Sequence, residues 1–145
     1  MLSFFKSKPP LVTDLSWLGV DIHSHLLPGI DDGAPDLATS LHLIHKLNEM
    51  GLKKFICTPH ILKEIYPNTP VTVNAALNLV QQGLQQGGSN IQIAAGAEYM
   101  IDGDFELGSD LLCLKDKYLL IEMSYLNETP NIDQIIFDMQ IKGYK

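Results

Sequence analysis

Residues 19–27 read GVDIHSHLL, and this stretch decides the fold class. Small or apolar side chains alternate there with polar ones, in the order Val20, Asp21, Ile22, His23, Ser24, His25, Leu26. A period of two predicts a β-strand over residues 19–27. The segment that follows, PGIDDGAPD, is rich in Gly, Pro and Asp, which indicates a loop.

Strands and helices are predicted to alternate along the rest of the chain. Apolar residues recur at helical spacing over 36–50, over 73–84 and from Thr129–Pro130 to Gly143. Further strands are predicted over 55–58, 91–97 and 118–123, whereas residues 100–117 show no clear pattern. This alternation indicates an α/β fold of parallel βα units, in which right-handed crossovers bring the carboxyl ends of the strands to one edge.

Length and composition describe one soluble globular domain. The chain has 145 residues, 46% of them hydrophobic, and a mean hydropathy of +0.07, which excludes a disordered tail or a collagen. No apolar run approaches the roughly 20 residues of a membrane-spanning helix, so no integral membrane segment is predicted. A closed eight-fold (β/α) barrel typically needs about 250 residues, so a barrel in this chain would be partial.

The charged residues and cysteines limit the partners and the compartment. The formal net charge is −7, and all ten basic residues are lysines that form no basic patch, which argues against nucleic acid as a partner. The two cysteines, Cys57 and Cys113, lie in apolar surroundings typical of buried thiols in a reducing cytosol. We therefore expect a cytoplasmic protein.

The first 14 residues are predicted to form an N-terminal arm. The apolar part of MLSFFKSKPP is too short for a secretory signal, and its lysines follow rather than precede it. The arm is expected to pack its phenylalanines against protein, with contact to a membrane surface as the alternative.

Histidines and carboxylates gather at the predicted strand ends. His23 and His25 lie two apart on a strand, so both imidazoles face one way and can reach one metal ion. Asp32 lies in the turn after that strand, His60 follows the second strand, and Glu98 ends the third. Each alone is explained better by turn chemistry or a solvated strand terminus than by metal binding. Together, at the edge where α/β folds hold their active sites, they predict a metal site.

The type of ligand limits the choice of metal. Three imidazoles and two carboxylates suit manganese, iron or catalytic zinc better than magnesium. More than one ion could bind, with Glu98 bridging them.

Other polar residues are not predicted as ligands. His42 and His45 lie off the apolar stripe of their helix, so we expect them on the surface. Asp21 lies deeper on the face of His23, which favours a supporting role. Glu122 lies within the predicted fourth strand and is not expected to bind metal.

The segment from Cys57 to Lys63 mimics the spacing of a cysteine-phosphatase loop. That loop needs an arginine at its last position to hold the phosphoryl oxygens, and the residue here is lysine. A cysteine nucleophile is therefore rejected.

Three motifs carry a resemblance to a known family: VDIHSHLLPGIDDGA (20–34), CTPH (57–60) and AAGAEYMID (94–102). They resemble the polymerase-and-histidinol-phosphatase (PHP) superfamily. Within it, the chain is most similar to the bacterial metal-dependent tyrosine phosphatases of capsule and exopolysaccharide operons, the CpsB/YwqE-like family. The similarity extends from about Leu15 to Lys145.

The resemblance implies a fold, a metal centre and a reaction. It implies that residues 15–145 are a partial PHP catalytic domain, the incomplete N-terminal part of a distorted (β/α) barrel with about four parallel βα units. It implies two to three ions, usually manganese, and a metal-held water that attacks phosphorus without a covalent phosphoenzyme. The substrate implied is phosphotyrosine on a bacterial tyrosine kinase. The metal ligands implied are His23, His25, Asp32, His60 and the bridging Glu98.

The chain departs from the family at its end. The family continues after the KGY sequence with an A-H-P-E-R strand and a D-x-H motif, which supply further ligands and phosphate-binding arginines. This sequence stops at Lys145 and has no arginine. Because such phosphate contacts contribute several kcal/mol to transition-state stabilisation, we expect this chain alone to be weakly active or inactive.

Two other functions stay open at this stage. One is a PHP-type phosphatase of a small phosphate monoester such as histidinol phosphate. The other is a non-catalytic remnant that binds metal or a partner, for instance a kinase. A PHP domain of a DNA polymerase is disfavoured because no polymerase sequence is present, and a homo-oligomer is left open.

Overall fold

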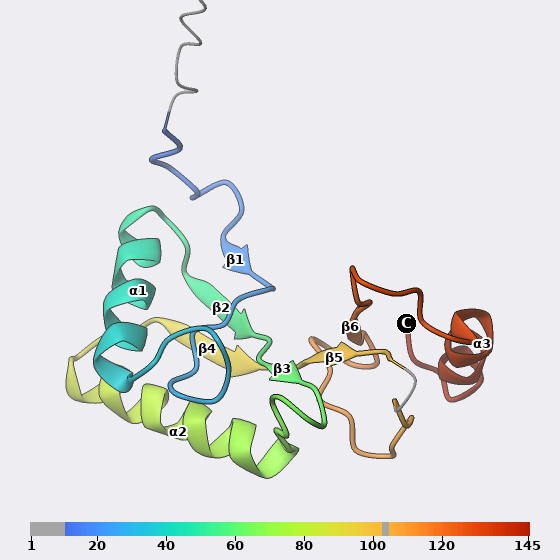
Figure 1. Ribbon diagram of the computed structural model, residues 1–145. Helices are drawn as coiled ribbons and strands as arrows, with labels where there is room; N and C mark the ends of the chain where they lie inside the picture. Colours follow the sequence, from blue (N-terminus) through green and yellow to red (C-terminus); the bar gives the residue numbers. More distant parts are fainter. Residues whose placement is uncertain (1–10, 103–104) are drawn as a thin grey trace, which may run out of the picture.

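The computed structural model describes residues 11–102 and 105–145, which contain six strands and three helices (Figure 1). In chain order these are β1 (Val20–Asp21), α1 (Leu37–Glu49), β2 (Lys54–Cys57), β3 (His60–Ile61), α2 (Pro70–Gln86), β4 (Gln92–Ala95), β5 (Glu98–Met100), β6 (Leu120–Glu122) and α3 (Ile132–Ile141). The first ten residues of the predicted arm lie outside the described part. Residues 11–14 have no regular secondary structure, and Leu11 and Val12 are exposed.

The strands form two three-stranded sheets, in the orders β1-β2-β4 and β3-β5-β6. Every strand pair is parallel, which confirms the predicted parallel α/β arrangement. The second sheet continues the first, because β2 leads directly into β3 and β4 leads into β5 (Figure 1). Across this junction the amide of Gly96 donates to the carbonyl of Cys57, and that of Glu98 to Pro59. The ends of the first sheet therefore meet the beginning of the second.

Helix α1 begins and ends within one residue of its predicted bounds, whereas α2 begins at Pro70, three residues before the predicted start at Val73. The carboxylate of Asp36 accepts a hydrogen bond from the amide of Thr39 at 2.7 Å and caps α1. Thr69 and Thr72 form a reciprocal capping box at the start of α2, which has Pro70 in its first turn. Both helices lie beside the first sheet, whereas α3 lies at the far end of the molecule, near the second sheet (Figure 1).

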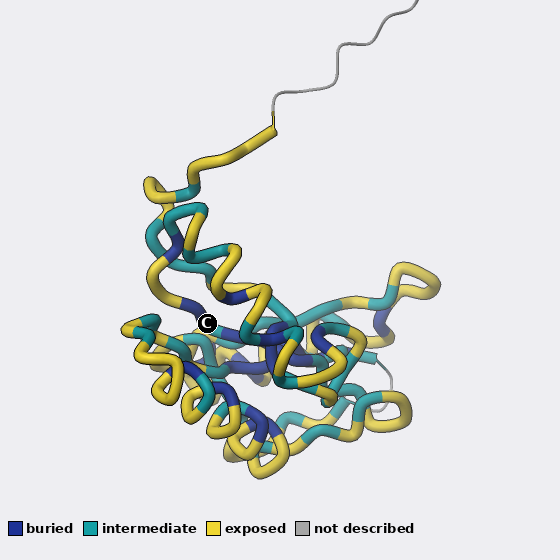
Figure 2. Tube along the Cα trace, turned by 90° about the vertical axis from the view of Figure 1, so that its left-hand side faces the viewer, coloured by how far each residue is buried: buried dark blue, intermediate teal, exposed yellow. Residues whose placement is uncertain are grey.

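The apolar core is divided between the two sheets. One cluster joins α1 and α2 to the first sheet and includes the fully buried Leu27, Ile44, Phe55, Val73 and Val80. A smaller cluster around Ile101, Met139 and Tyr144 joins α3 to the second sheet. Burying a side chain of this kind contributes roughly 1.5–3 kcal/mol, so the larger cluster contributes more to the stability of the fold than the smaller one. Figure 2 shows the buried segments gathered inside, between helix faces that are exposed outward.

The first strand is shorter than predicted. The ladder contains only Val20 and Asp21, rather than residues 19–27. Beyond it the carboxylate of Asp21 accepts a hydrogen bond from the amide of His23, which bends the chain out of the ladder. Leu26 and Leu27 are both buried, which strict alternation does not allow. The period-two pattern thus ends where the chain turns into the core.

The predicted third and fourth strands also differ from the structure. The run over 91–97 becomes β4 and then, after Gly96 and Ala97, the separate β5. A Cβ atom on Gly96, between the two strands, would lie 3.2 Å from the backbone of Cys113, so another segment passes close to the chain at this break. The strand predicted over 118–123 is reduced to β6, with Glu122 at its end. None of the helices in the described ranges has the length and apolar character needed to cross a membrane.

Candidate metal centre

The junction between the two sheets places polar side chains on one face. His60 begins β3 and pairs with Glu98, the first residue of β5, which in turn pairs with Leu120 of β6. Paired residues of a parallel ladder share a face, and so does a residue two positions further along. Glu122, two residues after Leu120, therefore shares the face of His60 and Glu98. Glu98 begins a strand rather than ending one, which corrects the prediction.

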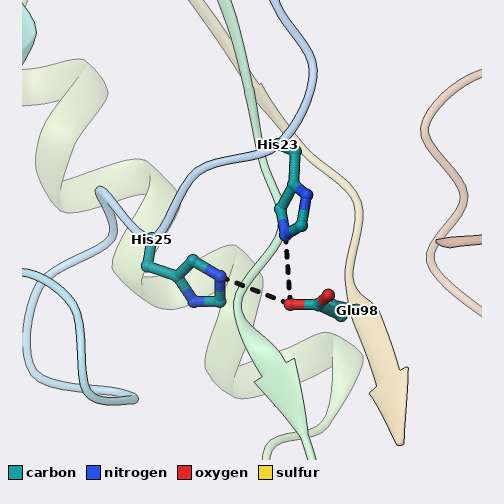
Figure 3. Close-up of side chains that lie close together, drawn as sticks. All are labelled: His23, His25 and Glu98. Atoms are coloured by element: carbon teal, nitrogen blue, oxygen red, sulfur yellow. Dashed lines mark ion pairs between the residues drawn. The ribbon is translucent and has the colours of Figure 1, made fainter. Parts of the chain in front are cut away.

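One oxygen of Glu98 is the point where three imidazoles meet. Its Oε2 lies 3.2 Å from Nε2 of His23 and 3.3 Å from Nε2 of His25 (Figure 3). It also lies 3.4 Å from Nδ1 of His60. The Glu98 side chain is only 8% exposed. Three imidazoles therefore surround one buried carboxylate.

The turn after β1 brings Asp32 to the same cluster. Asp32 Oδ1 lies 3.7 Å from Nε2 of His60 and 4.0 Å from Nδ1 of His25, and its side chain is 62% exposed. The structure therefore brings all five residues singled out from the sequence into one cluster. Asp32 forms its solvent-facing side.

Glu122 is a sixth member, which the sequence reading left out. Its Oε2 lies 3.4 Å from Nδ1 of His60. That oxygen is buried and accepts no hydrogen bond from any residue that the structure describes. A buried carboxylate oxygen in this situation is costly unless a cation completes its contacts. The only local signal was a single acidic residue among the apolar ones of LLIEM.

The cluster divides into three groups whose ligand atoms lie within 4.8 Å of one another. The groups are His23, His25 and Glu98; His25, Asp32 and His60; and His60, Glu98 and Glu122. Neighbouring groups share His25, His60 or Glu98, so the donor set fits more than one ion. Mixed imidazole and carboxylate donors, together with the unsatisfied oxygen of Glu122, fit a divalent transition metal.

A buried neighbour, Asp31, is hydrogen-bonded to one histidine of the cluster, His25. Its Oδ2 accepts a hydrogen bond from Nδ1 of His25 at 2.7 Å, and its side chain is 0% exposed. Burial alone would raise the pKa of Asp31, but the hydrogen bonds from His25 and from the Gly33 and His60 amides outweigh it and lower that pKa. The same contact with Asp31 raises the pKa of His25, against the effect of burial.

The amide side chain of Asn68 ties the two loops of the cluster together. Its Nδ2 donates to the carbonyl of Ile30 at 2.7 Å and to the carbonyl of His60 at 2.9 Å. Its Oδ1 in turn accepts a hydrogen bond from the hydroxyl of Thr72 on α2. The loop that carries Asp31 and Asp32 is thereby held against the start of β3. The sequence reading did not identify Asn68.

Unlike Glu122, three other residues set aside from the sequence, His42, His45 and Cys57, lie where expected. His42 and His45 are exposed on α1, and His45 Nδ1 lies 2.6 Å from the carbonyl of Leu41 in its own helix. Cys57 is fully buried, and burial raises the pKa of its thiol to about 12. Such a thiol is neutral and enclosed, which agrees with the rejection of a cysteine nucleophile.

Comparison with known proteins identifies relatives of the whole region from β1 onward. Residues 19–145 match the family model described as "Capsular polysaccharide synthesis, CpsB/CapC". The tyrosine-protein phosphatase YwqE of Bacillus subtilis is 34% identical over 129 residues, which are 86% of this chain and 51% of the relative. The putative tyrosine-protein phosphatase CapC of Staphylococcus aureus is 27% identical over 130 residues, again 86% of this chain and 51% of the relative.

A solved structure agrees with these matches. The chain superposes with a TM-score of 0.74 and 35% identity on a structure from a study of YwqE from Bacillus subtilis and CpsB from Streptococcus pneumoniae, described as unique metal-dependent tyrosine phosphatases. The superposition covers 86% of this chain and 52% of the other. The chain thus spans about half the length of the curated relatives that it matches. On the extent of the family match and the identity to YwqE, the chain belongs to the CpsB/CapC family of capsular polysaccharide synthesis.

Proposed function

We propose that the cluster around Glu98 is part of the metal centre of a protein-tyrosine phosphatase that acts on a bacterial tyrosine kinase of capsule or exopolysaccharide synthesis. The observation that carries this proposal is the meeting of three imidazole nitrogens within 3.4 Å of one buried carboxylate oxygen. The names of the relatives favour a phosphotyrosine protein over a small phosphate monoester as the substrate.

In this proposal His23, His25, Asp32, His60 and Glu98 are the ligands, with Glu98 bridging, and Glu122 is added to them. Divalent ions, when bound, neutralise phosphate oxygens and lower the pKa of water. The protein side chains hold the donors in place, and the partly exposed Asp32 leaves one side of the cluster open to substrate. Mixed imidazole and carboxylate donors suit manganese, iron or zinc. Manganese is the ion we propose among these, because the family resemblance implies it.

A cavity further along the chain segments that carry His60, Glu98 and Glu122 has room for a bulky substrate, although none of the proposed ligands lines it. It encloses about 480 Å³ and lies among the segments that follow β3, β5 and β6, with Lys63, Met100, Tyr125 and Leu126 in its lining. Apolar side chains of this lining can take up an aromatic ring. Its charged residues are one lysine, Lys63, and three carboxylates, Glu64, Asp102 and Glu128, so the positive charge for a phosphate would come from the metal centre.

The finer points of the family resemblance are part of the same proposal. The two parallel sheets would be the first part of a distorted PHP-type barrel of about four βα units, within a catalytic domain over 15–145 preceded by the arm over 1–14. The two free cysteines suit the reducing cytoplasm, where the kinase substrate would be met.

Binding of a phosphotyrosine peptide next to the metal tests the proposed phosphatase function even if turnover is slow. We would add Mn²⁺ and measure the paramagnetic broadening of the ³¹P signal of a phosphotyrosine peptide, with histidinol phosphate as the competing small substrate. Broadening of the peptide signal that needs the chain, and that Glu98→Gln removes, is expected. Equal broadening with the Gln variant, or selective broadening of histidinol phosphate, would contradict the proposal.

A further inference from the structure

We propose that Asp31 is a positioning residue of this metal centre, whose carboxylate fixes the His25 ring so that its Nε2 is the metal ligand. The inference rests on the metal centre proposed above and adds a role for a residue outside the ligand set. Asp31 is adjacent in sequence to the ligand Asp32, but the two side chains differ completely in exposure, 0% against 62%.

The hydrogen bond between Asp31 and His25 determines which imidazole nitrogen is free. An ionised carboxylate only accepts hydrogen bonds, so Nδ1 of His25 must carry the proton in the 2.7 Å contact. The lone pair is then on Nε2, the atom that lies 3.3 Å from Oε2 of Glu98. A carboxylate that accepts from the distal nitrogen of a metal-binding imidazole fixes its tautomer and strengthens it as a ligand.

This contact also assigns His25 to one of two groups. Asp32 lies 4.0 Å from Nδ1 of His25, the nitrogen that Asp31 occupies. Nε2 faces Glu98, which His23 also approaches through its own Nε2. His25 is therefore assigned to the group with His23 and Glu98, and not to Asp32.

Asp31 holds two further parts of the centre. Its Oδ1 accepts from the amide of Gly33 at 2.9 Å, which shapes the turn that presents Asp32. Its Oδ2 accepts from the amide of His60 at 3.2 Å, across 29 residues of sequence. Every donor to this buried carboxylate thus belongs to a ligand or to a ligand-bearing turn. Burying a carboxylate is costly unless it is fully hydrogen-bonded, and here the compensating bonds all order the metal centre.

The experiment uses zinc as a diamagnetic probe of the whole chain. Calorimetric zinc titration would be combined with long-range ¹H–¹⁵N spectra of the imidazoles, which identify the nitrogen that binds zinc. In the unaltered chain we expect His25 to bind through Nε2 and to keep a proton on Nδ1. Asp31→Ala should weaken zinc binding roughly 10- to 100-fold, which is the loss typical of such supporting carboxylates. In the spectra it should change the His25 signals more than those of His23.

Asp36→Ala is the matched control, because it removes the same charge and destabilises α1 without touching a histidine. It should leave zinc affinity and the His25 signals unchanged. If Asp31→Ala does not fold, Asp31→Asn keeps the shape and should show the same effect to a smaller extent. Binding of His25 through Nδ1, or unchanged zinc affinity in the folded Asp31 variants, would overturn the positioning role alone. A failure of the unaltered chain to bind zinc through these histidines would overturn the metal centre itself.

Discussion

A Cβ atom on Gly33 would lie 2.1 Å from the carbonyl oxygen of His25, so the turn after β1 passes directly against the backbone of a proposed ligand. This approach lets the amide of Ala34 donate to that same carbonyl. It also brings Asp31 within reach of the His25 ring. Glycine is needed here because of space rather than because of an unusual φ.

Gly33→Ala should therefore displace the turn. We expect a loss of about 1–3 kcal/mol in the free energy of unfolding, as for other overpacked sites, together with weaker metal binding. Thermal unfolding with and without Mn²⁺ would measure both effects. Gly87→Ala is the matched control, since a Cβ there meets only ordinary contacts at 3.5 Å or more. If the two variants behave alike, the close approach has no importance for the site.

Glu98 and Glu122 should differ in their importance for metal binding. Three imidazoles lie within 3.4 Å of Glu98, whereas among residues 11–102 and 105–145 His60 is the one imidazole within 4.0 Å of Glu122. Glu98→Gln should weaken Mn²⁺ binding by more than the roughly 10- to 100-fold typical of a supporting residue, and Glu122→Gln by less than Glu98→Gln. Calorimetric titration would measure this order, with the exposed Glu49→Gln as the control. A larger loss for Glu122→Gln would mean that Glu98 is not the bridging group.

Much of this arrangement could be predicted because its signals are local. The apolar spacing and caps of α1 and α2 lie within each helix, so their bounds agree with the prediction to within about a turn. The spacing of His23 and His25, and the positions of His60 and Glu98 after apolar runs, are likewise visible in short segments. The parallel order of the strands then brings these segments together.

What could not be predicted depends on contacts between distant segments. β3 has only two residues, and its pairing with β5 joins His60 to Glu98 through a register that no local pattern encodes. The same register decides that Glu122 reaches His60. Asp31 and Asp32 have the same chemistry in sequence, and only the packing of the turn buries one and exposes the other. Hydrophobic periodicity carries none of this information.

Removal of metal should lower the thermal stability. The donor groups are held by tertiary structure, so an ion binds the folded chain in preference to the unfolded one. At a free concentration about 100 times Kd this stabilises the fold by about 2.7 kcal/mol, or roughly 5–10 °C in Tm for a chain of this size. Scanning fluorimetry in Mn²⁺ and in excess EDTA would measure the difference. A triple variant, His23→Ala, His25→Ala and Glu98→Gln, should show no such shift.

The buried thiol of Cys57 should make the fold sensitive to alkaline pH. Its pKa is raised by burial to about 12 from an ordinary 9.0, so between these values the unfolded chain loses a proton that the folded chain keeps. The free energy of unfolding should therefore be unaffected by this group below pH 9 and fall by up to about 1.36 kcal/mol per pH unit above it.

Urea unfolding between pH 8 and pH 11 would measure this slope. Cys57→Ala should flatten it, and Cys113→Ala, at a half-buried position, should flatten it less. Some slope should persist above pH 10, because burial also raises the pKa of Tyr99 to about 12. An unchanged slope in Cys57→Ala would show that this thiol does not titrate as its burial implies.

The rate of phosphate release should be low for this chain by itself. Its ten basic residues are all lysines, so no guanidinium can hold phosphate oxygens in two places at once. Loss of one preorganised contact to developing charge typically costs about 10²- to 10³-fold in kcat. Release of phosphate from a phosphotyrosine peptide with Mn²⁺ should therefore be far slower than with YwqE of Bacillus subtilis under the same conditions, and Glu98→Gln should abolish what remains. Turnover equal to that of YwqE would show that lysines and metal suffice for the phosphate contacts.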